Sequence, residues 1–212
     1  MRIIAFSGYK GSGKSFVSKI LKKYLKLHGL KVKEDSYAEP MKRFCVDVLG
    51  IDEDLIYGDD SKKNLKTKYK WSRLPKYIKD RFPNHGKYLT GREVQCVFGT
   101  ELTRELFTQD IWIDCLNRKI LKAKAKGIQY FIITDLRFKN ELKSIKELGG
   151  EVWFIYGNRV VKKDKKTAAH ITEKNYNYIC KRSNYLIKND LIDNKKSIEL
   201  KIAEILKTNG AL

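Results

Sequence analysis

Gly8-Tyr9-Lys10-Gly11-Ser12-Gly13-Lys14-Ser15 is the stretch that decides the fold class of this 212-residue chain. It has the pattern G-x-x-x-x-G-K-[ST], whose glycines let backbone N–H groups turn toward an anion without a side chain in the way. In this pattern the lysine reaches the β- and γ-phosphates of a nucleotide, and the last hydroxyl is a ligand of Mg²⁺. The stretch therefore predicts a site for a nucleoside triphosphate.

The residues on either side of this loop give it the required context. Arg2 to Phe6 is a short apolar run of strand character, and Lys14 to His28 has apolar residues at helical spacing up to Gly29. A strand before the loop and a helix after it bring the positive end of the helix dipole to the phosphates. We expect the loop to turn from a strand into a helix at the bound anion.

Strand-like and helical segments alternate along the rest of the chain. The expected strands are Arg2–Phe6, Leu30–Lys33, Tyr130–Ile133, Glu151–Tyr156 and Asn184–Ile187. The expected helices are Lys14–His28, Met41–Leu49, one from Thr90 with Glu93 at capping-box spacing, one from near Asp110 to Gly127, Asn140–Leu148 and Lys195–Leu206. Such alternation predicts an α/β fold with a parallel sheet, helices on both faces, and ligands at the carboxyl ends of the strands.

The bulk composition suits one domain spanning residues 1–212. Hydrophobic residues make up 42% of the chain, which is enough for a sizeable core. No apolar run approaches the roughly 18 residues that a membrane helix needs, and the N-terminus lacks the apolar region of a secretory signal. We expect a cytoplasmic protein without a membrane partner (in the host cytoplasm, if the chain is viral).

The four cysteines lie far apart in the sequence, at Cys45, Cys96, Cys115 and Cys180. They form no Cys-x-x-Cys pair, and the three histidines do not cluster with them. Zinc ligands normally come in closely spaced pairs, so this pattern favours reduced, half-buried thiols over a metal site.

A basic segment at residues 59–87 interrupts the alternation. From Ser61 to Lys87 there are ten Lys or Arg residues and one acidic residue, Asp80, and the net charge of the chain is +20. We interpret the segment as an excursion from the core fold, mobile or wrapped over a ligand. The charge indicates either a nucleic-acid partner or a lysine-rich protein with a site for small anions, and the sequence leaves both open.

Asp135 and Arg137 directly follow the strongest predicted strand. A carboxylate at a strand end beside a phosphate loop can hold Mg²⁺ or its water, and an arginine there can bind phosphate oxygens with two donors. The alternative is a solvated turn with a surface ion pair, which the phosphate loop makes less favourable.

The stretch Thr90 to Asp114 contains residue types that suit a nucleotide, namely Arg92, Gln95, Gly99, Thr100, Arg104 and Trp112. Arginine binds phosphate, an aromatic ring stacks on a base, and an amide reads a base edge. A pair of amphipathic helices with Trp112 in the core explains the same residues, and the pattern alone does not separate the two interpretations.

Several short blocks along the chain occur together in one known family. After the loop come Tyr37-Ala38-Glu39-Pro40-Met41-Lys42, then Gly99-Thr100-Glu101-Leu102 with Arg104 and Asp110-Ile111-Trp112, then Asp135-Leu136-Arg137-Phe138-Lys139-Asn140-Glu141 with Leu148-Gly149-Gly150. A weaker block is His170-Ile171-Thr172-Glu173 with Asn189-Asp190. With these blocks, spaced along nearly its whole length, the chain resembles the bacteriophage-type deoxynucleoside monophosphate kinases, a branch of the P-loop nucleotide kinases.

The resemblance implies a three-layer fold like that of nucleoside monophosphate kinases, with a five-stranded parallel sheet, substrate-binding segments and a lid. It implies transfer of the γ-phosphoryl group of ATP to a deoxynucleoside monophosphate (dNMP), in deoxynucleotide biosynthesis, with Mg²⁺. The implied ATP-binding residues are Lys10, Gly11, Ser12, Gly13, Lys14 and Ser15, with Ser15 and Asp135 at the metal. The implied dNMP-binding residues are Lys10, Arg43, Gln95, Thr100, Arg104, Trp112, Arg137 and Asn140, and the catalytic residues are Lys14, Asp135 and Arg137.

The sequence departs from the family in two places and leaves rival functions open. Lys139 stands where similar sequences often have proline, and residues 59–87 match nothing in the family. Residues 157–170 are interpreted either as a lid, in which Arg159 would close on the site, or as a solvated lysine-rich turn, and the sequence leaves both open. His170 is expected to have a structural or surface role. The rivals are a P-loop kinase of another small acceptor, an ATP-dependent nucleic-acid-binding protein, and a protein that binds nucleotide only as a regulator. A weak nucleic-acid contact through the basic surface and a homodimer also stay open.

Overall fold

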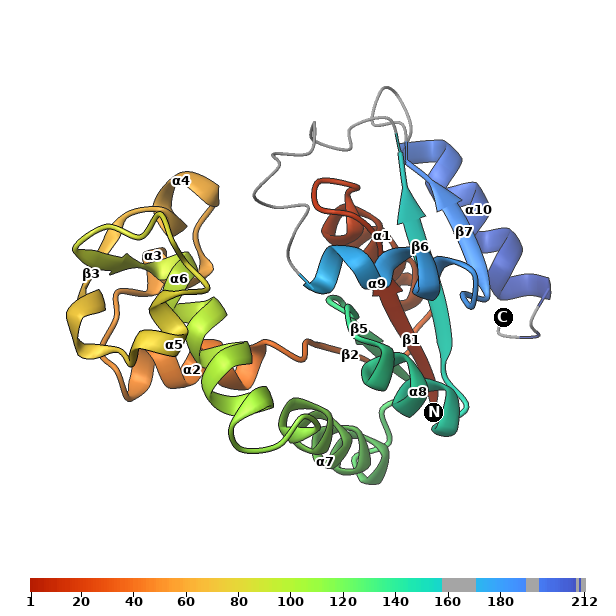
Figure 1. Ribbon diagram of the computed structural model, residues 1–212. Coiled ribbons are helices and arrows are strands. Elements are labelled where there is room, and N and C mark those ends of the chain that lie inside the picture. Colours follow the sequence, from red (N-terminus) through yellow and green to blue (C-terminus); the bar gives the residue numbers. More distant parts are fainter. Residues whose placement is uncertain (158–170, 190–194, 209, 211–212) are drawn as a thin grey trace. The chain divides into compact units, whose positions relative to one another are not determined.

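The computed structural model describes residues 1–157, 171–189, 195–208 and 210, with the backbone alone for residues 171–174. The chain divides into two compact units (Figure 1). Unit 1 comprises Met1–Tyr37 and Leu116–Leu212, and unit 2 comprises Ala38–Cys115. A single kinase domain over residues 1–212 stays a prediction, as does the lid, because residues 158–170 with Arg159 and His170 lie outside the described part.

Unit 1 is built on a parallel sheet that has five strands among the described residues. They are β1 (Arg2–Ser7), β2 (Val32–Asp35), β5 (Tyr130–Ile133), β6 (Glu151–Tyr156) and β7 (Tyr185–Lys188). Their order is β2-β5-β1-β6-β7, so β1 lies at the centre between β5 and β6. Ala5 pairs with Ile133 of β5 and with Val152 of β6, which brings the carboxyl ends of all three strands to the same edge.

Helices cover both faces of this sheet. Ile4 and Phe6 of β1 belong to a buried cluster with apolar residues of α1 (Lys14–Leu27) and α10 (Lys195–Thr208). Two further helices, α8 (Lys139–Glu147) and α9 (Ile171–Cys180), pack against β6 and β1 respectively (Figure 1). Successive side chains along a strand point to opposite faces of the sheet. Because helices cover both faces, the β1 side chains that point to either face are buried. The predicted three-layer α/β fold with a five-stranded parallel sheet is confirmed.

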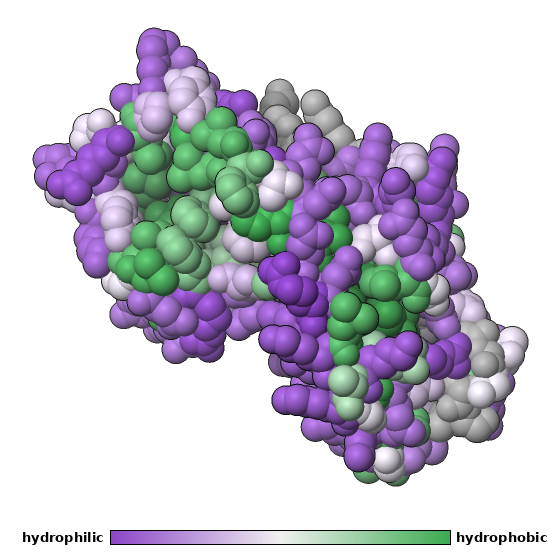
Figure 2. All heavy atoms as spheres, turned by 90° about the horizontal axis from the view of Figure 1, so that it is seen from below, coloured by the Kyte–Doolittle hydropathy of each residue, from purple (hydrophilic) through white to green (hydrophobic). Residues whose placement is uncertain are grey.

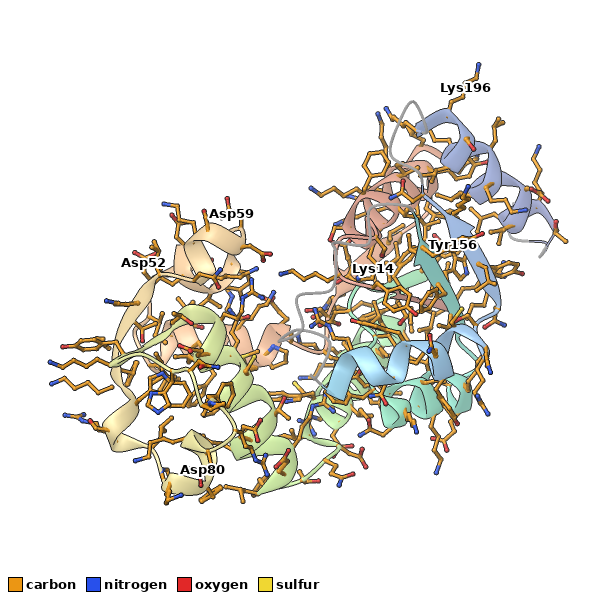
Figure 3. The ribbon with its side chains drawn as sticks, turned by 45° about the horizontal axis from the view of Figure 1, so that its top comes forward. Lys14, Asp52, Asp59, Asp80, Tyr156 and Lys196 are labelled. Carbon is orange, nitrogen blue, oxygen red and sulfur yellow. The ribbon has the colours of Figure 1, made fainter. Side chains whose placement is uncertain are left out.

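Unit 2 consists mainly of short helices around a small ribbon. The helices are α2 (Glu39–Asp47), α3 (Glu53–Tyr57), α4 (Asp60–Lys63), α5 (Lys76–Lys79) and α6 (Gly91–Cys96), with a 3₁₀ turn at Trp71–Arg73. The strands β3 (Lys66–Lys70) and β4 (Tyr88–Thr90) pair antiparallel. Asp52 and Asp59, labelled in Figure 3, cap α3 and α4 because their side chains accept backbone N–H groups of the first turn.

The last part of unit 2 leads back into unit 1. Thr90 and Glu93 form the predicted capping box at the start of α6, with the Thr90 N–H donating to Oε2 of Glu93 at 2.7 Å. A π-helical segment, Val97–Glu105, continues from α6. Helix α7 (Ile111–Ala125) then begins in unit 2 and ends in unit 1.

The basic segment 59–87 is ordered in a way that the sequence did not predict. It contains α4, β3 and α5 and holds the buried side chains of Trp71 and Ile78. The ring of His85 stacks on Trp71 with 4.5 Å between centroids. The exposed lysines at alternate positions of β3 hide its strand character in a hydrophobicity pattern, so these elements were not predicted. The interpretation of the segment as an excursion that is mobile or wrapped over a ligand stays a prediction.

Other differences from the predicted elements are small. The second strand begins at Val32, two residues later than expected, and α9 was not predicted. Cys45 is buried, which raises the pKa of its thiol to about 11, and the other three cysteines are partly exposed. Hydrophilic residues cover most of the face seen in Figure 2, in keeping with the high net charge.

We predict that truncation of Leu21 destabilises the protein far more than truncation of Leu27. Both leucines belong to α1, but Leu21 is fully buried and Leu27 is 75% exposed. Leu21→Ala should lower the free energy of unfolding by about 2–5 kcal/mol through lost burial and a cavity. Leu27→Ala is the matched control and should change it by less than about 0.5 kcal/mol. Urea denaturation followed by circular dichroism measures both, and equal losses would contradict this packing of α1.

Candidate active site

The phosphate loop leaves β1 at a point of very close contact with β6. Gly8 has φ +142°, and a Cβ atom placed on it would lie 2.1 Å from the carbonyl oxygen of Ile155. Any side chain here would collide with the backbone of the neighbouring strand. Gly11 and Gly13 adopt φ values of +78° and +85°, in the left-handed region that glycine occupies without cost. The three glycines of the motif are therefore required by the backbone.

The start of α1 is arranged to receive an anion. Gly13 precedes the helix and has no side chain to cap it, and no acidic residue lies in the first turn. The N–H groups of Phe16 and Val17 already donate to the Gly13 carbonyl, at 3.0 and 3.1 Å. The first N–H groups of a helix have no partner within it, and together with the helix dipole they favour a phosphate.

Lys14, labelled in Figure 3, folds back over the loop that precedes it. Its Nζ donates to the carbonyl oxygens of Gly8 and Tyr9, at 2.7 and 2.8 Å. These contacts hold the ammonium group above the loop where phosphates are expected to bind. Because a carbonyl is a weaker partner than an anionic oxygen, the lysine can exchange these bonds for a phosphate.

Two asparagines hold the phosphate loop in place through hydrogen bonds. Sequence reasoning did not assign them to the site. Asn189, just after β7, is fully buried, and its Nδ2 donates to the carbonyl of Ser12 at 2.9 Å. Its own N–H donates to the carbonyl of Tyr156 at 2.7 Å. Asn177 of α9 accepts the hydroxyl hydrogen bond of Tyr9 at 2.7 Å. The Asn189-Asp190 pair in the weaker family block was the only sequence signal for this support.

Asp135 is held beside the phosphate loop by the pairing of β1 with β5. The N–H of Leu136 donates to the carbonyl of Phe6 at 3.1 Å, and the Ser7 hydroxyl donates to the carbonyl of Leu136 at 2.9 Å. Oδ1 of Asp135 accepts the backbone N–H of Tyr37 at 2.8 Å. These bonds fix the carboxylate at the edge of the sheet from which the phosphate loop also leaves.

Glu141 positions the chain around Arg137, a role that the sequence did not reveal. Its carboxylate is buried, and Oε2 accepts the backbone N–H groups of Arg137 and Phe138, at 2.7 and 3.0 Å. Asn140 accepts the N–H of Glu141 through Oδ1 at 3.1 Å. The turn between β5 and α8 is thereby fixed, and the side chain of Arg137 remains exposed.

The oxygen atoms of Ser15 and Asp135 fit a magnesium ion better than a transition metal. A hydroxyl at the start of α1 and a carboxylate after the adjacent β5 are hard donors of the type that Mg²⁺ prefers, and Mg²⁺ commonly takes its remaining ligands from phosphates and water. The described part of the chain holds no group of three or more His, Cys, Asp or Glu residues arranged for a metal ion. This donor set therefore suits a metal that arrives with a nucleotide.

Five of the predicted site residues lie in unit 2, where Arg104 and Trp112 are the most firmly held. The guanidinium of Arg104 is largely buried and donates to the carbonyl of Gln109 at 3.3 Å. The indole N–H of Trp112 donates to the carbonyl of Gly99 at 3.0 Å. Thr100 directly follows Gly99 in the π-helical segment, a backbone form that is frequent at functional sites.

Gln95 and Arg43 make contacts within the protein that limit which of their atoms can bind a ligand. The Nε2 of Gln95 donates to the carbonyls of Ile56 and Gly91, at 3.2 and 3.3 Å, which leaves its oxygen to accept. The exposed Arg43 lies 3.4 Å from Glu39 and 3.5 Å from Glu53. Burial, and then the hydrogen bond to Glu39, raise the pKa of the nearby Tyr57, so its hydroxyl stays protonated.

The predicted residues thus fall into two groups. Unit 1 brings together the phosphate loop and the turn after β5, which are Lys10, Gly11, Ser12, Gly13, Lys14, Ser15, Asp135, Arg137 and Asn140. Unit 2 holds the residues Arg43, Gln95, Thr100, Arg104 and Trp112. Their roles in binding stay predictions.

Comparison with known proteins gives the family of this chain. Residues 45–199, more than half of the chain, match the family model described as deoxynucleotide monophosphate kinase. The chain belongs to the deoxynucleotide monophosphate kinase family. A protein of Acanthamoeba polyphaga mimivirus named as a candidate deoxynucleotide monophosphate kinase is 28% identical over 164 residues, covering 71% of each chain. As a member of this family the protein is an ATP-dependent phosphotransferase.

Similarity to solved structures is weaker. The dephospho-CoA kinase from Campylobacter jejuni superposes with a TM-score of 0.48 at 16% identity, covering 99% of this chain and 100% of its own. A shikimate kinase from Aquifex aeolicus gives 0.47 at 14% identity, with 98% of both chains covered. Similarity at this level carries no information on the substrate of this kinase. No described helix of the chain is long and apolar enough to cross a membrane.

We predict that Gly8→Ala weakens ATP binding by displacing the loop. The added methyl group would meet the backbone of β6, and alanine disfavours the positive φ. The variant should lose about 1–3 kcal/mol of stability and bind ATP at least tenfold more weakly. Calorimetric titration with ATP and urea denaturation measure the two effects. Gly86→Ala is the control, since the nearest atom to its new Cβ lies 4.0 Å away; ATP affinity unchanged in Gly8→Ala would contradict the geometry.

Proposed function

We propose that this kinase transfers the γ-phosphoryl group of ATP to a deoxynucleoside monophosphate, giving ADP and the deoxynucleoside diphosphate. The observation that carries the proposal is the joint position of two anion-binding elements in unit 1. The phosphate loop after β1 and the Asp135-x-Arg137 turn after β5 leave adjacent strands at the same edge of the sheet. The family supports a nucleotide kinase, and the sequence blocks support a dNMP as its acceptor.

The donor triphosphate is bound by the loop and by the start of α1. Lys14 gives up its bonds to the Gly8 and Tyr9 carbonyls and binds the β- and γ-phosphates, with Lys10 as a second cation. Ser15 and Asp135 would hold Mg²⁺, directly or through its water. When bound, Mg²⁺ neutralises charge on the phosphates and keeps them oriented.

The acceptor phosphate is bound by arginine. Arg137 supplies a guanidinium from the turn that Glu141 fixes, and Asn140 adds an amide beside it. From unit 2, Arg104 is the strongest phosphate ligand because its guanidinium is already ordered. Arg43 serves only if phosphate replaces its carboxylate partners, Glu39 and Glu53.

Unit 2 binds the base of the monophosphate through the shape of the site and through one hydrogen-bond acceptor. Trp112 is buried and uses its indole N–H within the protein, so it contributes to the shape of the site and reads no base atom. Gln95 uses both amide hydrogens within the protein, so its oxygen reads a donor on the base edge. Thr100 offers a hydroxyl that can donate or accept.

Phosphoryl transfer then needs placement and positive charge more than covalent help from the protein. The transition state spreads negative charge over the transferred group, and cations fixed around it lower its energy. Lys14 supplies this charge on the donor side, and Arg137 and Arg104 supply it on the acceptor side. Asp135 would help to hold Mg²⁺ and takes no part as a nucleophile.

We predict that the purified protein with Mg-ATP converts one or more dNMPs to diphosphates. Chromatography of products from a full panel of dNMPs and NMPs measures this and also tests other small acceptors. Lys14→Ala should lower kcat/KM by about 100-fold or more while leaving the circular dichroism spectrum unchanged. Lys19→Ala, on the exposed side of the same helix, is the control and should remain active. A panel in which no monophosphate is phosphorylated would refute the proposed function.

We predict that Arg104→Lys weakens binding of the dNMP and leaves binding of ATP unchanged. Lysine keeps the charge but loses the two-donor fork, so the KM for the dNMP should rise about tenfold while the KM for ATP stays constant. Arg92→Lys is the control, because Arg92 is on the surface of the same unit and is held by Asp60 and Asn64. Initial-rate kinetics with each substrate varied separately gives both constants. A rise in the KM for ATP of similar size would show that Arg104 acts through the fold.

A further inference from the structure

A surface pocket between α8 and α9 in unit 1 is not used by the proposed reaction. Its volume is about 360 Å³, within the range of small-molecule sites. The residues lining it are Lys139, Leu142, Lys143, Lys146, Tyr178 and Arg182. Four of the six carry a positive charge, and none of these described lining residues is acidic.

The neighbours of these cations leave the pocket strongly positive. Lys143 pairs with Glu147 at 3.7 Å, but both side chains are mostly exposed and such pairs contribute little. Lys146 donates to the side-chain oxygen of Asn184 at 2.6 Å, which neutralises no charge. The pocket therefore attracts a ligand with several negative charges.

The pocket also has a flat apolar part. Tyr178 is partly exposed, and the guanidinium carbon of Arg182 lies 3.7 Å from the centre of its ring. The ammonium group of Lys139 lies 4.8 Å from the same ring. A guanidinium stacked on a tyrosine presents a second flat surface, on which a nucleobase can stack in turn. Leu142 adds a buried apolar wall.

The positions of the lysines give the site a direction. Lys139 begins α8, and Lys143 and Lys146 follow one and two turns later, about 6 and 10 Å along the helix axis. Cations spaced in this way along one helix suit a chain of phosphate groups. Arg137 and Asn140, which the proposed reaction uses, lie at the start of the helix, whereas Lys143 and Lys146 lie farther along it.

We propose that this pocket binds a nucleotide in addition to the two substrates, with the base on the Arg182–Tyr178 stack and the phosphates on Lys143 and Lys146. The ligand class is a base joined to two or more phosphates. This chemistry occurs in a free nucleoside polyphosphate and in a single nucleic-acid strand. The inference does not rest on the proposed acceptor, since none of these four residues takes part in the proposed transfer.

The test is equilibrium binding of radiolabelled ATP and of a fluorescent thymidine oligonucleotide to the full chain. The variant Lys143→Glu with Lys146→Glu should weaken binding of at least one of these probes about tenfold or more. Lys122→Glu with Lys126→Glu, exposed lysines in the last turn of α7 and directly after it, changes the net charge equally and should have no such effect. Binding of ATP to the phosphate loop is followed separately through Lys14→Ala, which should leave the second site intact.

A further variant, Tyr178→Ala, tests the base, and inorganic triphosphate tests whether charge alone is recognised. Tyr178→Ala should weaken binding of the nucleotide, and inorganic triphosphate should compete poorly with the nucleotide for the site. If the Lys143→Glu with Lys146→Glu variant binds ATP more weakly, the site is assigned to free nucleotides. If that variant binds only the oligonucleotide more weakly, the site is assigned to a nucleic-acid strand. Equal binding by the two double variants, or competition by triphosphate as strong as by ATP, would overturn the proposal. Kinase activity at saturating substrates should be unchanged in Lys143→Glu with Lys146→Glu, so failure here is distinct from failure of the proposed function.

Discussion

The contact between Gly8 and the carbonyl of Ile155 is the constraint on which the rest of unit 1 depends. The exit of the central strand β1 lies directly against the backbone of β6, so the phosphate loop can begin there only with glycine. On the other side, β5 pairs with β1 and carries Asp135 to the same edge. Asn189 closes the arrangement from β7 through the Ser12 carbonyl. The loop is thus supported by the strands beside it, so an error in sheet packing would reach the anion site directly.

Unit 2 keeps several polar side chains ordered through contacts within the unit. The carbonyls of the π-helical segment take donors from outside the backbone pattern, with Trp112 on Gly99 and the Thr103 hydroxyl on Phe98 at 2.8 Å. Arg81 is paired with Glu101 and Glu105 on the same segment. For the acceptor binding proposed above, side chains that are already fixed would lose less entropy.

Much of the fold could be read from the sequence because its signals are local. The glycine pattern of the loop, the apolar run Tyr130–Ile133 and the Thr90–Glu93 capping box each involve neighbouring residues, and the structure has all three. The β3–β4 ribbon was missed because its lysines alternate with Thr67 and Tyr69 and disguise a half-buried strand. Glu141 and Asn189 were missed as supports because their partners are backbone atoms, which no residue pattern displays. The sequence named the groups expected to bind substrate more readily than the groups that hold them.

The division of the chain also has a consequence for how the protein is made. Strands β1 and β2 are not neighbours in the sheet; each pairs with β5, which the ribosome produces only after all of residues 38–115. Unit 2 is one continuous segment, so its contacts can form while the first two strands of unit 1 still await their partner. A compact segment spans less distance than a disordered chain of the same length, which lowers the entropic cost of closing β2 onto β5. The order of synthesis therefore favours folding of unit 2 first and completion of the central sheet of unit 1 last.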